Sequence, residues 1–240
     1  IIDTLQNMTL TLSLCSLLIF LLLDQRAFSA EYHINDVNDL VTFSGNVNTG
    51  KSYSGTTVFL DADLDFSGGL SELFEPIGNN SAKHFQGTFD GRGYTINNLV
   101  MNSTSQYVGL FGYPYGATIR NVVLGSSCSA ISSYIGSDST YVGGIAGYYY
   151  GGSCTIENTV NIASVSFIGN INMTWAFIGG VVGRLYGPRA NEALARNCAN
   201  YGSVVLSGYA YNDTRPAYIG GIVGYLDGSS SNFCIQNCFN

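Results

Sequence analysis

Four copies of one short pattern recur beyond residue 106, and this repetition restricts the fold more than any other feature of the chain. Each copy joins an aromatic residue, an aliphatic residue and a glycine to a few small or aliphatic residues and a closing glycine. The copies are YVGLFGY at 107–113, YVGGIAGY at 141–148, FIGGVVGR at 177–184 and YIGGIVGY at 218–225. Their closing glycines are 35, 36 and 41 residues apart, a period typical of stacked repeats. We therefore expect a stack of similar units, each packing its apolar residues against the next.

Each repeat contains two further segments in a fixed order. A segment with a central or final asparagine follows each glycine block, at 119–121, 156–158, 195–197 and 235–237, and a segment rich in Val and Ser comes next. Three short extended segments per repeat, bounded by Gly, Ser and Asn, are typical of strands and turns. The sequence predicts an all-β fold, a parallel β-solenoid resembling a right-handed β-helix, with corresponding strands ~4.8 Å apart.

The recurring asparagines are expected to lie above one another in this stack. They are Asn121, Asn158, Asn197 and Asn237. Stacked amides hydrogen-bond along a stack, as they do in cross-β ladders, so we interpret these residues as structural turn asparagines and not as a binding site. Paired glycines at 143–144 and 179–180 predict bends where one backbone segment approaches another.

The chain is expected to have three parts. Residues 1–30 are a signal peptide or a retained N-terminal segment, 31–100 a less regular cap with the first strands, and 101–240 the repeats, which we expect to continue further. In the cap, Asn35 is a helix-capping residue, and Val37, Leu40 and Phe43 are apolar at helical spacing. This pattern predicts a short amphipathic helix that closes one end of the solenoid.

The N-terminal segment contains 14 almost wholly apolar residues, 10–23. That length suits the hydrophobic region of a secretory signal peptide and falls short of the ~20 residues that span a bilayer. Met8 is then the expected initiator, with cleavage after Ser29 or Ala30. No positive charge precedes the apolar run, so a retained anchor or an inter-subunit strand is the alternative. Membrane contact is expected only if this segment is not cleaved.

The composition favours an extracellular protein and excludes some partners. Charged residues make up 10% of the 240 residues, against about 25% in an average globular protein. With 9 basic residues against 16 acidic ones, the chain has no basic surface to neutralise phosphates, so nucleic acid is not an expected partner. No motif indicates a cofactor. We expect the protein to be secreted or placed at the cell surface.

Four N-x-Ser/Thr acceptors predict N-glycosylation and support secretion. They are Asn79, Asn102, Asn172 and Asn212. The last three precede the aromatic residue of a repeat by five, five and six residues. The same loop of successive units is therefore expected to carry a row of sugars.

Five cysteines follow the N-terminal segment, which itself contains Cys15. They are Cys128, Cys154, Cys198, Cys234 and Cys238. An odd number in a secreted chain implies an intermolecular bridge, a free thiol or a partner outside this sequence. Cys128 aligns with Val165 and Val204, which predicts a buried thiol. Cys198 aligns with Cys238, so a bridge between these two, or between Cys198 and Cys234, is compatible with the spacing. No Cys or His spacing predicts a zinc site.

Acidic residues supply the candidates for metal binding and catalysis. Asp61, Asp63 and Asp65 alternate, so one strand would point three carboxylates to the same face. A solvated strand face explains them, and a Ca²⁺ site, which needs six to eight oxygen ligands, is the alternative. Polysaccharide-processing β-helices place acidic pairs beside a basic residue, and no such pair recurs here. We therefore expect no catalytic residues and no enzymatic activity.

Several segments together resemble the GLUG-repeat family of secreted surface proteins. They are LDADLDF at 60–66, PIG at 76–78, FQGTFDGRGYTINNL at 85–99 and VGLFG at 108–112. The resemblance covers about residues 31–240 and is most specific over 85–121. It implies a β-helix-like, adhesin-like stalk that displays or connects, without catalytic residues. The clustered glycosylation acceptors and the low charge depart from the family and favour a eukaryotic surface glycoprotein.

The expected function follows from these features together. We expect a non-enzymatic, secreted structural glycoprotein that forms an extracellular filament or a surface stalk. It would self-associate end to end or through the N-terminal segment. A carbohydrate-binding adhesin is the first alternative, because tyrosines near the turns could stack on glycans. A β-helix enzyme that processes polysaccharides is the second.

Overall fold

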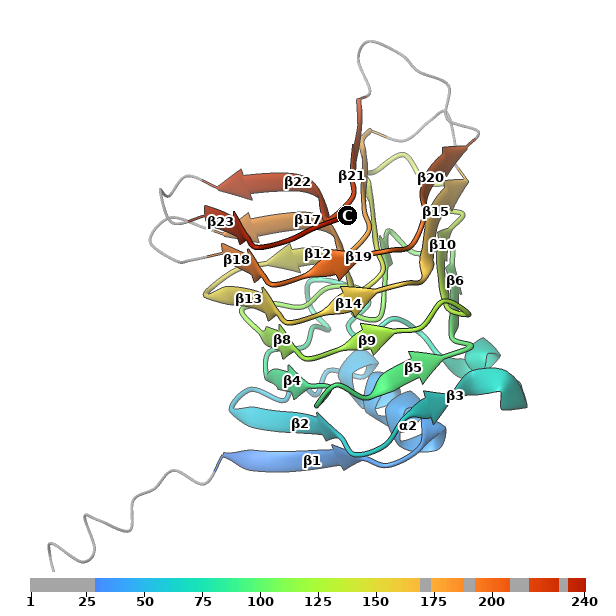
Figure 1. The fold of residues 1–240 in the computed structure, drawn as a ribbon, viewed down its shortest axis with the longest axis vertical. Helices are drawn as coiled ribbons and strands as arrows, with labels where there is room; N and C mark the ends of the chain where they lie inside the picture. The colour runs from blue at the N-terminus through green and yellow to red at the C-terminus, as the bar shows by residue number, and fades with distance from the viewer. Residues whose placement is uncertain (1–28, 169–173, 188–192, 208–215, 229–232) are drawn as a thin grey trace, which may run out of the picture. The chain divides into compact units, whose positions relative to one another are not determined.

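The computed structural model describes residues 29–168, 174–187, 193–207, 216–228 and 233–240 (Figure 1). The chain divides into two compact units, Ile1–Ala30 and Glu31–Asn240. The apolar run of the predicted signal peptide lies outside the described residues. Among the residues that are described, no helix has the length and hydrophobicity needed to cross a bilayer.

The second unit is an all-β solenoid built from five sheets. The largest sheet holds β1 (Ala30–Ile34), β2 (Thr56–Leu60), β4 (Thr88–Asp90), β8 (Thr118–Arg120), β13 (Cys154–Glu157), β18 (Ala193–Arg196) and β23 (Phe233–Gln236). A second sheet holds β3 (Leu64–Asp65), β5 (Thr95–Asn97), β9 (Val123–Leu124), β14 (Val160–Asn161) and β19 (Ala199–Asn200). A third holds β6 (Val100–Ser103), β10 (Ser129–Ser132), β15 (Ser164–Ile168) and β20 (Val204–Ser207). The fourth holds β7 (Tyr107–Val108), β11 (Thr140–Gly143), β16 (Ala176–Gly179) and β21 (Ala217–Gly220), and the fifth β12 (Ala146–Tyr150), β17 (Val182–Gly187) and β22 (Val223–Gly228).

Strands follow one another through each sheet in chain order (Figure 1). Every paired strand from β2 onward runs parallel to its neighbour. A complete coil passes once through all five sheets, as β8, β9, β10, β11 and β12 do in succession. The parallel β-solenoid predicted from the repeat is therefore confirmed.

The number of strands per coil differs from the prediction, because two of the three expected segments contain a corner. The Val- and Ser-rich segment is divided, since β14 ends at Asn161 and β15 begins at Ser164. The expected turn before it lies at Asn121, where a φ of 54° ends β8. Asparagine tolerates this conformation better than most other non-glycine residues. The glycine block is split as well, since β11 ends at Gly143 and β12 begins at Ala146. Each complete coil consequently has five short strands instead of three.

Aliphatic and aromatic side chains in register form the core. In the largest sheet one interior column runs through Val58, Phe89, Ile119, Ile156 and Ala195, and each of these residues is fully buried. A fully buried aliphatic or aromatic side chain contributes about 1.5–3 kcal/mol to stability. Stacking like residues from successive coils thus gives the solenoid a continuous core along its length.

The predicted cap helix is present as α2 (Val37–Asn48). Its N-cap is Asp36, whose side chain accepts a hydrogen bond from the Asp39 N–H at 2.9 Å, and not the expected Asn35. Leu40, Phe43 and Val47 are fully buried in the solenoid core. The short 3₁₀ turns η1 (Phe66–Gly68) and η2 (Leu70–Leu73) follow β3. The helix therefore replaces strands in the first coil and covers its apolar interior.

Candidate functional site

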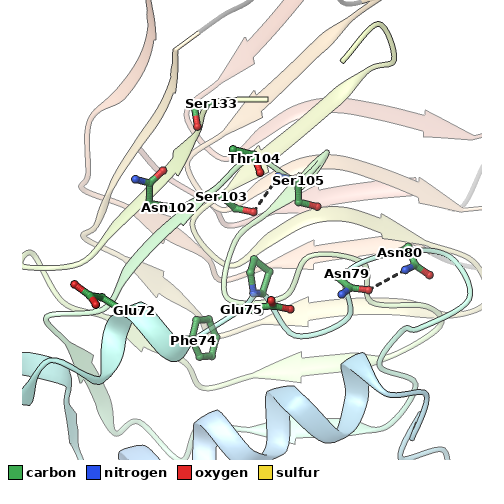
Figure 2. Close-up of a pocket in the computed structure, with 11 residues that line it drawn as sticks. Glu72, Phe74, Glu75, Asn79, Asn80, Asn102, Ser103, Thr104, Ser105 and Ser133 are labelled. Carbon is green, nitrogen blue, oxygen red and sulfur yellow. Dashed lines mark hydrogen bonds between the residues drawn. The ribbon is translucent and has the colours of Figure 1, made fainter. Parts of the chain in front are cut away.

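A polar groove lies beside η2 and β6 (Figure 2). Its volume is about 680 Å³. It is lined by Glu72, Phe74, Glu75, Pro76, Asn79, Asn80, Asn102, Ser103, Thr104, Ser105 and Ser133. The lining residues include hydroxyls, amides and two carboxylates but no Lys, Arg or His.

The cap helix fixes one wall of this groove. The Ser44 hydroxyl donates to the carbonyl oxygen of Glu75 at 2.5 Å. The Asn48 amide donates to the carbonyl of Pro76 at 3.1 Å and accepts from the Gly78 N–H at 3.0 Å. Both helix residues are buried. The loop that carries Glu75 and Asn79 is thus held by buried polar contacts and not only by its own turns.

Two of the four predicted glycosylation acceptors open into the groove (Figure 2). Asn79 is half-buried and accepts from the Asn80 side chain at 2.8 Å. Asn102 is exposed and lies within strand β6, not in the predicted loop. Asn172 and Asn212 fall outside the described residues. Sugars attached at Asn79 and Asn102 would therefore share one hollow.

The three alternating aspartates do not share one strand face. Strand β2 ends at Leu60 and β3 begins at Leu64, so Asp61 and Asp63 lie between strands. Asp61 contacts Arg92 and accepts from His33 Nδ1 at 2.5 Å. Asp63 accepts from the Thr95 N–H at 2.7 Å. Asp65 accepts from the Ser67 N–H at 2.9 Å and from the side chain of Asn98 at 2.7 Å. The single strand face expected for these aspartates is therefore wrong, both as a solvated face and as the basis of the Ca²⁺ alternative, because each carboxylate has its own partners.

The four ladder asparagines occupy equivalent outer corners. Asn158, Asn197 and Asn237 each have a φ of 51°. The Asn197 side chain donates to Asn158 Oδ1 at 3.0 Å, and Asn237 donates to Asn197 Oδ1 at 3.3 Å. Asn121 instead donates to Asp90 Oδ1 at 2.9 Å. The amide ladder therefore joins Asn158, Asn197 and Asn237, while Asn121 bonds to a carboxylate instead.

A second amide ladder lies in the interior and was not predicted from the sequence. The Asn161 side chain donates to Asn200 Oδ1 at 2.8 Å, and Asn200 donates to Asn240 Oδ1 at 2.6 Å. Asn161 and Asn200 are buried, and in the coil before them Leu124 holds the same register position. The signal was an asparagine three residues after each of the last three outer ladder residues. The spacing alone does not show that the side chains of these asparagines point into the interior.

Asp90 joins the outer ladder to two arginines. Its carboxylate accepts from the Arg92 N–H, from Arg120 Nε and from the Asn121 side chain, each at 2.9 Å. Burial alone would raise the pKa of Asp90, but these hydrogen bonds and the charge of Arg120 lower it below 3.8. A carboxylate with a depressed pKa stabilises the fold above its unfolded-state pKa, and this contribution is lost as the pH falls through the folded-state value.

Replacing Asp90 with asparagine is expected to lower the free energy of unfolding by about 1–3 kcal/mol at pH 7, since one amide cannot accept all three hydrogen bonds. The difference from the wild type should shrink as the pH is lowered below 3.8, where the unfolded carboxyl is protonated. Urea unfolding at pH 7 and at successively lower pH measures it. The exposed Glu72→Gln variant is the control and should unfold like the wild type. A constant difference at all pH values would contradict the assignment.

All five described cysteines are free thiols. Cys128 is buried as predicted, but Ala130 and not Cys128 is the register partner of Val165. Burial raises the pKa of Cys154 and of Cys198 to about 12, so neither is a reactive thiolate at neutral pH. The Cys198 N–H donates to Cys238 Sγ at 3.4 Å, which places these two side chains in adjacent coils. Cys234 instead pairs in register with Leu194. A bridge between Cys198 and Cys238 stays a prediction for the oxidised protein.

Aromatic side chains form ordered columns on the fourth and fifth sheets. Tyr107, Tyr141, Phe177 and Tyr218 stack in register with ring centroids 5.2–5.3 Å apart and interplanar angles of 6–11°. Tyr150 and Tyr186 stack beside them at 5.0 Å. Rings at these separations attract one another beyond the area they bury. The aromatic residue that opens each repeat is therefore a stacking residue.

Comparison with known proteins supports the fold of this chain and does not indicate an activity. No protein-family model matches the sequence, and no curated protein matches it. A solved structure of similar fold is that of a "putative immunoglobulin A1 protease" from Bacteroides ovatus. The two chains share 16% sequence identity with a TM-score of 0.52, over 88% of this chain and 75% of the other. This likeness supports a shared β-rich fold, and the resemblance to the GLUG-repeat family has no matching family model.

Proposed function

We propose that this chain is a non-enzymatic, secreted structural glycoprotein whose solenoid forms part of an extracellular stalk. The main supporting observation is that aliphatic side chains of the last described coil are exposed, although their register partners in the coil before it are buried. Ile178 in β16 is fully buried, whereas its register partner Ile219 in β21 is 52% exposed. Leu226 and Ile235 are likewise exposed, although the residues below them in register are buried. Within the described residues, the apolar interior of this coil is therefore not covered by another element.

Strand edges accompany the exposed apolar residues. In the described part of the chain, β20, β21, β22 and β23 each end their sheet. Edge strands with free backbone groups are templates for further strands. A further coil of the same repeat, from this chain or from a second copy, would complete the hydrogen bonding and cover the apolar side chains.

The first coil differs, and this difference favours a stalk over an end-to-end filament. Helix α2 covers the interior there, and exposed charged groups, Glu31 and His33, lie on the edge strand β1. Charged side chains on an edge strand oppose pairing with another chain. An end-to-end filament would require this helix-covered, charged coil to pair with another copy, so the described first coil disfavours such a contact. An end-to-end filament is the alternative.

Glycosylation and the absence of catalysis are further parts of the proposal. The exposure of Asn102 and the position of Asn79 beside the same groove support N-glycosylation at these two acceptors. The two carboxylates in the groove, Glu72 and Glu75, have no basic residue among the other lining residues. The resemblance to the GLUG-repeat family, whose members display or connect, supports the same function.

Sedimentation velocity of the full chain over a range of concentrations tests the open coil. We expect the 25.6 kDa chain to associate reversibly as its concentration rises. The Ile219→Lys/Ile235→Lys variant should bind itself at least about 10-fold more weakly, because each buried aliphatic contributes about 1.5–3 kcal/mol. Ile168→Lys, at an exposed aliphatic of an inner coil, is the matched control and should associate like the wild type. A wild type that stays monomeric throughout would contradict the proposal.

A further inference from the structure

Two residues interrupt the aromatic columns of the fifth sheet. Arg184 in β17 lies in register between Tyr148 and Tyr225. Asp227 in β22 takes the place that Tyr186 holds one coil earlier. The two residues form an ion pair, in which Nη2 of Arg184 lies 2.5 Å from Oδ2 of Asp227. A pair of opposite charges is thus set among aromatic side chains.

A pocket of about 230 Å³ surrounds this ion pair and is separate from the polar groove. We call it the Arg184 pocket; its lining is Trp175, Phe177, Arg184, Tyr218, Tyr225 and Asp227. Trp175 is 42% exposed, and its ring lies 6.1 Å from that of Phe177 in an edge-to-face arrangement. The rings of Tyr218 and Tyr225 are 4.7 Å apart. Aromatic surfaces of differing orientation therefore form the walls.

The guanidinium is held firmly within this pocket. Its carbon lies 5.1–5.6 Å from the ring centroids of Tyr148, Phe177 and Tyr225. Only 16% of the Arg184 side chain is exposed, and its Nε is buried without a hydrogen-bond partner among the described residues. A buried donor without an acceptor costs about 1–3 kcal/mol. Asp227 is more open, with 35% of its side chain exposed.

We propose that the Arg184 pocket binds a single neutral sugar ring. The electron-rich faces of aromatic rings attract the C–H groups on the apolar face of a sugar. A sugar hydroxyl both donates and accepts hydrogen bonds, so neighbouring hydroxyls match a carboxylate acceptor beside a guanidinium donor. The volume is below the ~300–1000 Å³ of pockets for drug-sized ligands, which limits the occupant to about one ring.

Charge decides between a neutral and an acidic sugar. The positive charge of Arg184 is already balanced by Asp227, so the pocket itself offers no net attraction to an anion. The chain as a whole carries a formal net charge of −7. Both facts disfavour sugar acids. The pocket goes beyond a stalk function. Tyr218, Tyr225 and Asp227 lie in β21 and β22, to which the proposed stalk would add a further coil, so sugar binding is proposed for the chain with this coil uncovered.

Fluorescence titration tests the proposal, since Trp175 is the only tryptophan in the sequence and reports directly on the pocket. The probes are the methyl α-glycosides of glucose, mannose and galactose, N-acetylglucosamine, and the acidic sugars glucuronic acid and N-acetylneuraminic acid. We expect a saturable change with at least one neutral probe. Asp227→Asn keeps the shape of the side chain and should weaken that binding about 10-fold, as loss of a hydrogen bond to a charged group does. Wild type and variants are produced in a host that does not N-glycosylate, because this substitution creates the acceptor NGS at 227–229.

Saturation-transfer difference NMR on the bound sugar gives a second measurement that does not rely on fluorescence. Tyr218→Ala removes one wall and should reduce the NMR signal at least 10-fold. Circular dichroism shows whether each variant folds. If Asp227→Asn does not fold, Tyr218→Ala still tests the proposal. Tyr201→Ala is the matched control, because Tyr201 is 64% exposed and does not line the pocket, and it should bind like the wild type. The proposal is overturned if no neutral probe saturates, if only acidic sugars bind, or if Asp227→Asn and Tyr218→Ala bind with unchanged affinity.

Discussion

Replacing Gly179 with alanine is expected to prevent folding of the solenoid, or to lower its free energy of unfolding by about 4 kcal/mol or more. A Cβ atom on Gly179 would lie 2.7 Å from the backbone nitrogen of Gly224 in the next coil, and closer still to the carbonyl oxygen of Val182. Backbone atoms cannot move aside as a flexible side chain can. Far-UV circular dichroism and urea unfolding measure the loss.

The matched control is a glycine with open space around it. Gly45 is exposed in the interior of α2, and a Cβ there would meet no atom within 4 Å. Because glycine destabilises a helix interior relative to alanine, Gly45→Ala should raise the free energy of unfolding by about 0.5–1 kcal/mol. If Gly179→Ala folded with wild-type stability, the close approach of adjacent coils at the glycine blocks would be wrong.

Replacing Asn200 with alanine is expected to lower the free energy of unfolding by about 2–4 kcal/mol, since several buried polar groups lose their partners. The Asn200 side chain donates to the Gly202 carbonyl at 2.9 Å and to Asn240 at 2.6 Å, and it accepts from Asn161 at 2.8 Å. Only 1% of Asn200 is exposed, so water cannot replace these hydrogen bonds. Urea unfolding followed by tyrosine fluorescence measures the change.

The outer ladder provides the comparison for this effect. Asn197 makes analogous side-chain hydrogen bonds but is exposed, and its φ of 51° is one that glycine adopts readily. Asn197→Gly should therefore cost less than about 1 kcal/mol, because water satisfies the amides left behind. Equal losses for Asn197→Gly and Asn200→Ala would show that burial does not distinguish the two ladders.

The sequence repeat predicted the fold because the same residues recur once per coil and stack directly. Tyr141 and Phe177 are paired in register, as the alignment of their blocks implies. The alignment was less reliable where no glycine block fixes it, so Cys128 was placed two residues away from its actual register. Strand number was underestimated because the glycine block and the Val- and Ser-rich segment each look like one strand, whereas β11 and β12 divide the first and β14 and β15 divide the second.

Sites made by exceptions to the repeat could not be predicted in the same way. Arg184 and Asp227 are 43 residues apart and belong to different columns, so no alignment of like positions brings them together. The polar groove depends on contacts from Ser44 and Asn48 to a loop outside the repeat. Periodicity predicts which residues stack in the same column. The Arg184–Asp227 contact joins two different columns, and the contacts of Ser44 and Asn48 lie outside the repeats.

The pairing of neighbouring coils, together with synthesis from the N-terminus, favours one order of folding. Tyr141 pairs with Phe177 and Phe177 with Tyr218, so each new coil needs about one repeat length of chain and a finished coil beneath it. The helix-capped coil is the first to be synthesised, and it presents a template for the next. We expect the polypeptide to add coils in sequence during translation, so that partly made chains always expose a single growing edge. A kinetic pause at one coil would leave every later coil unfolded while the earlier ones remain native.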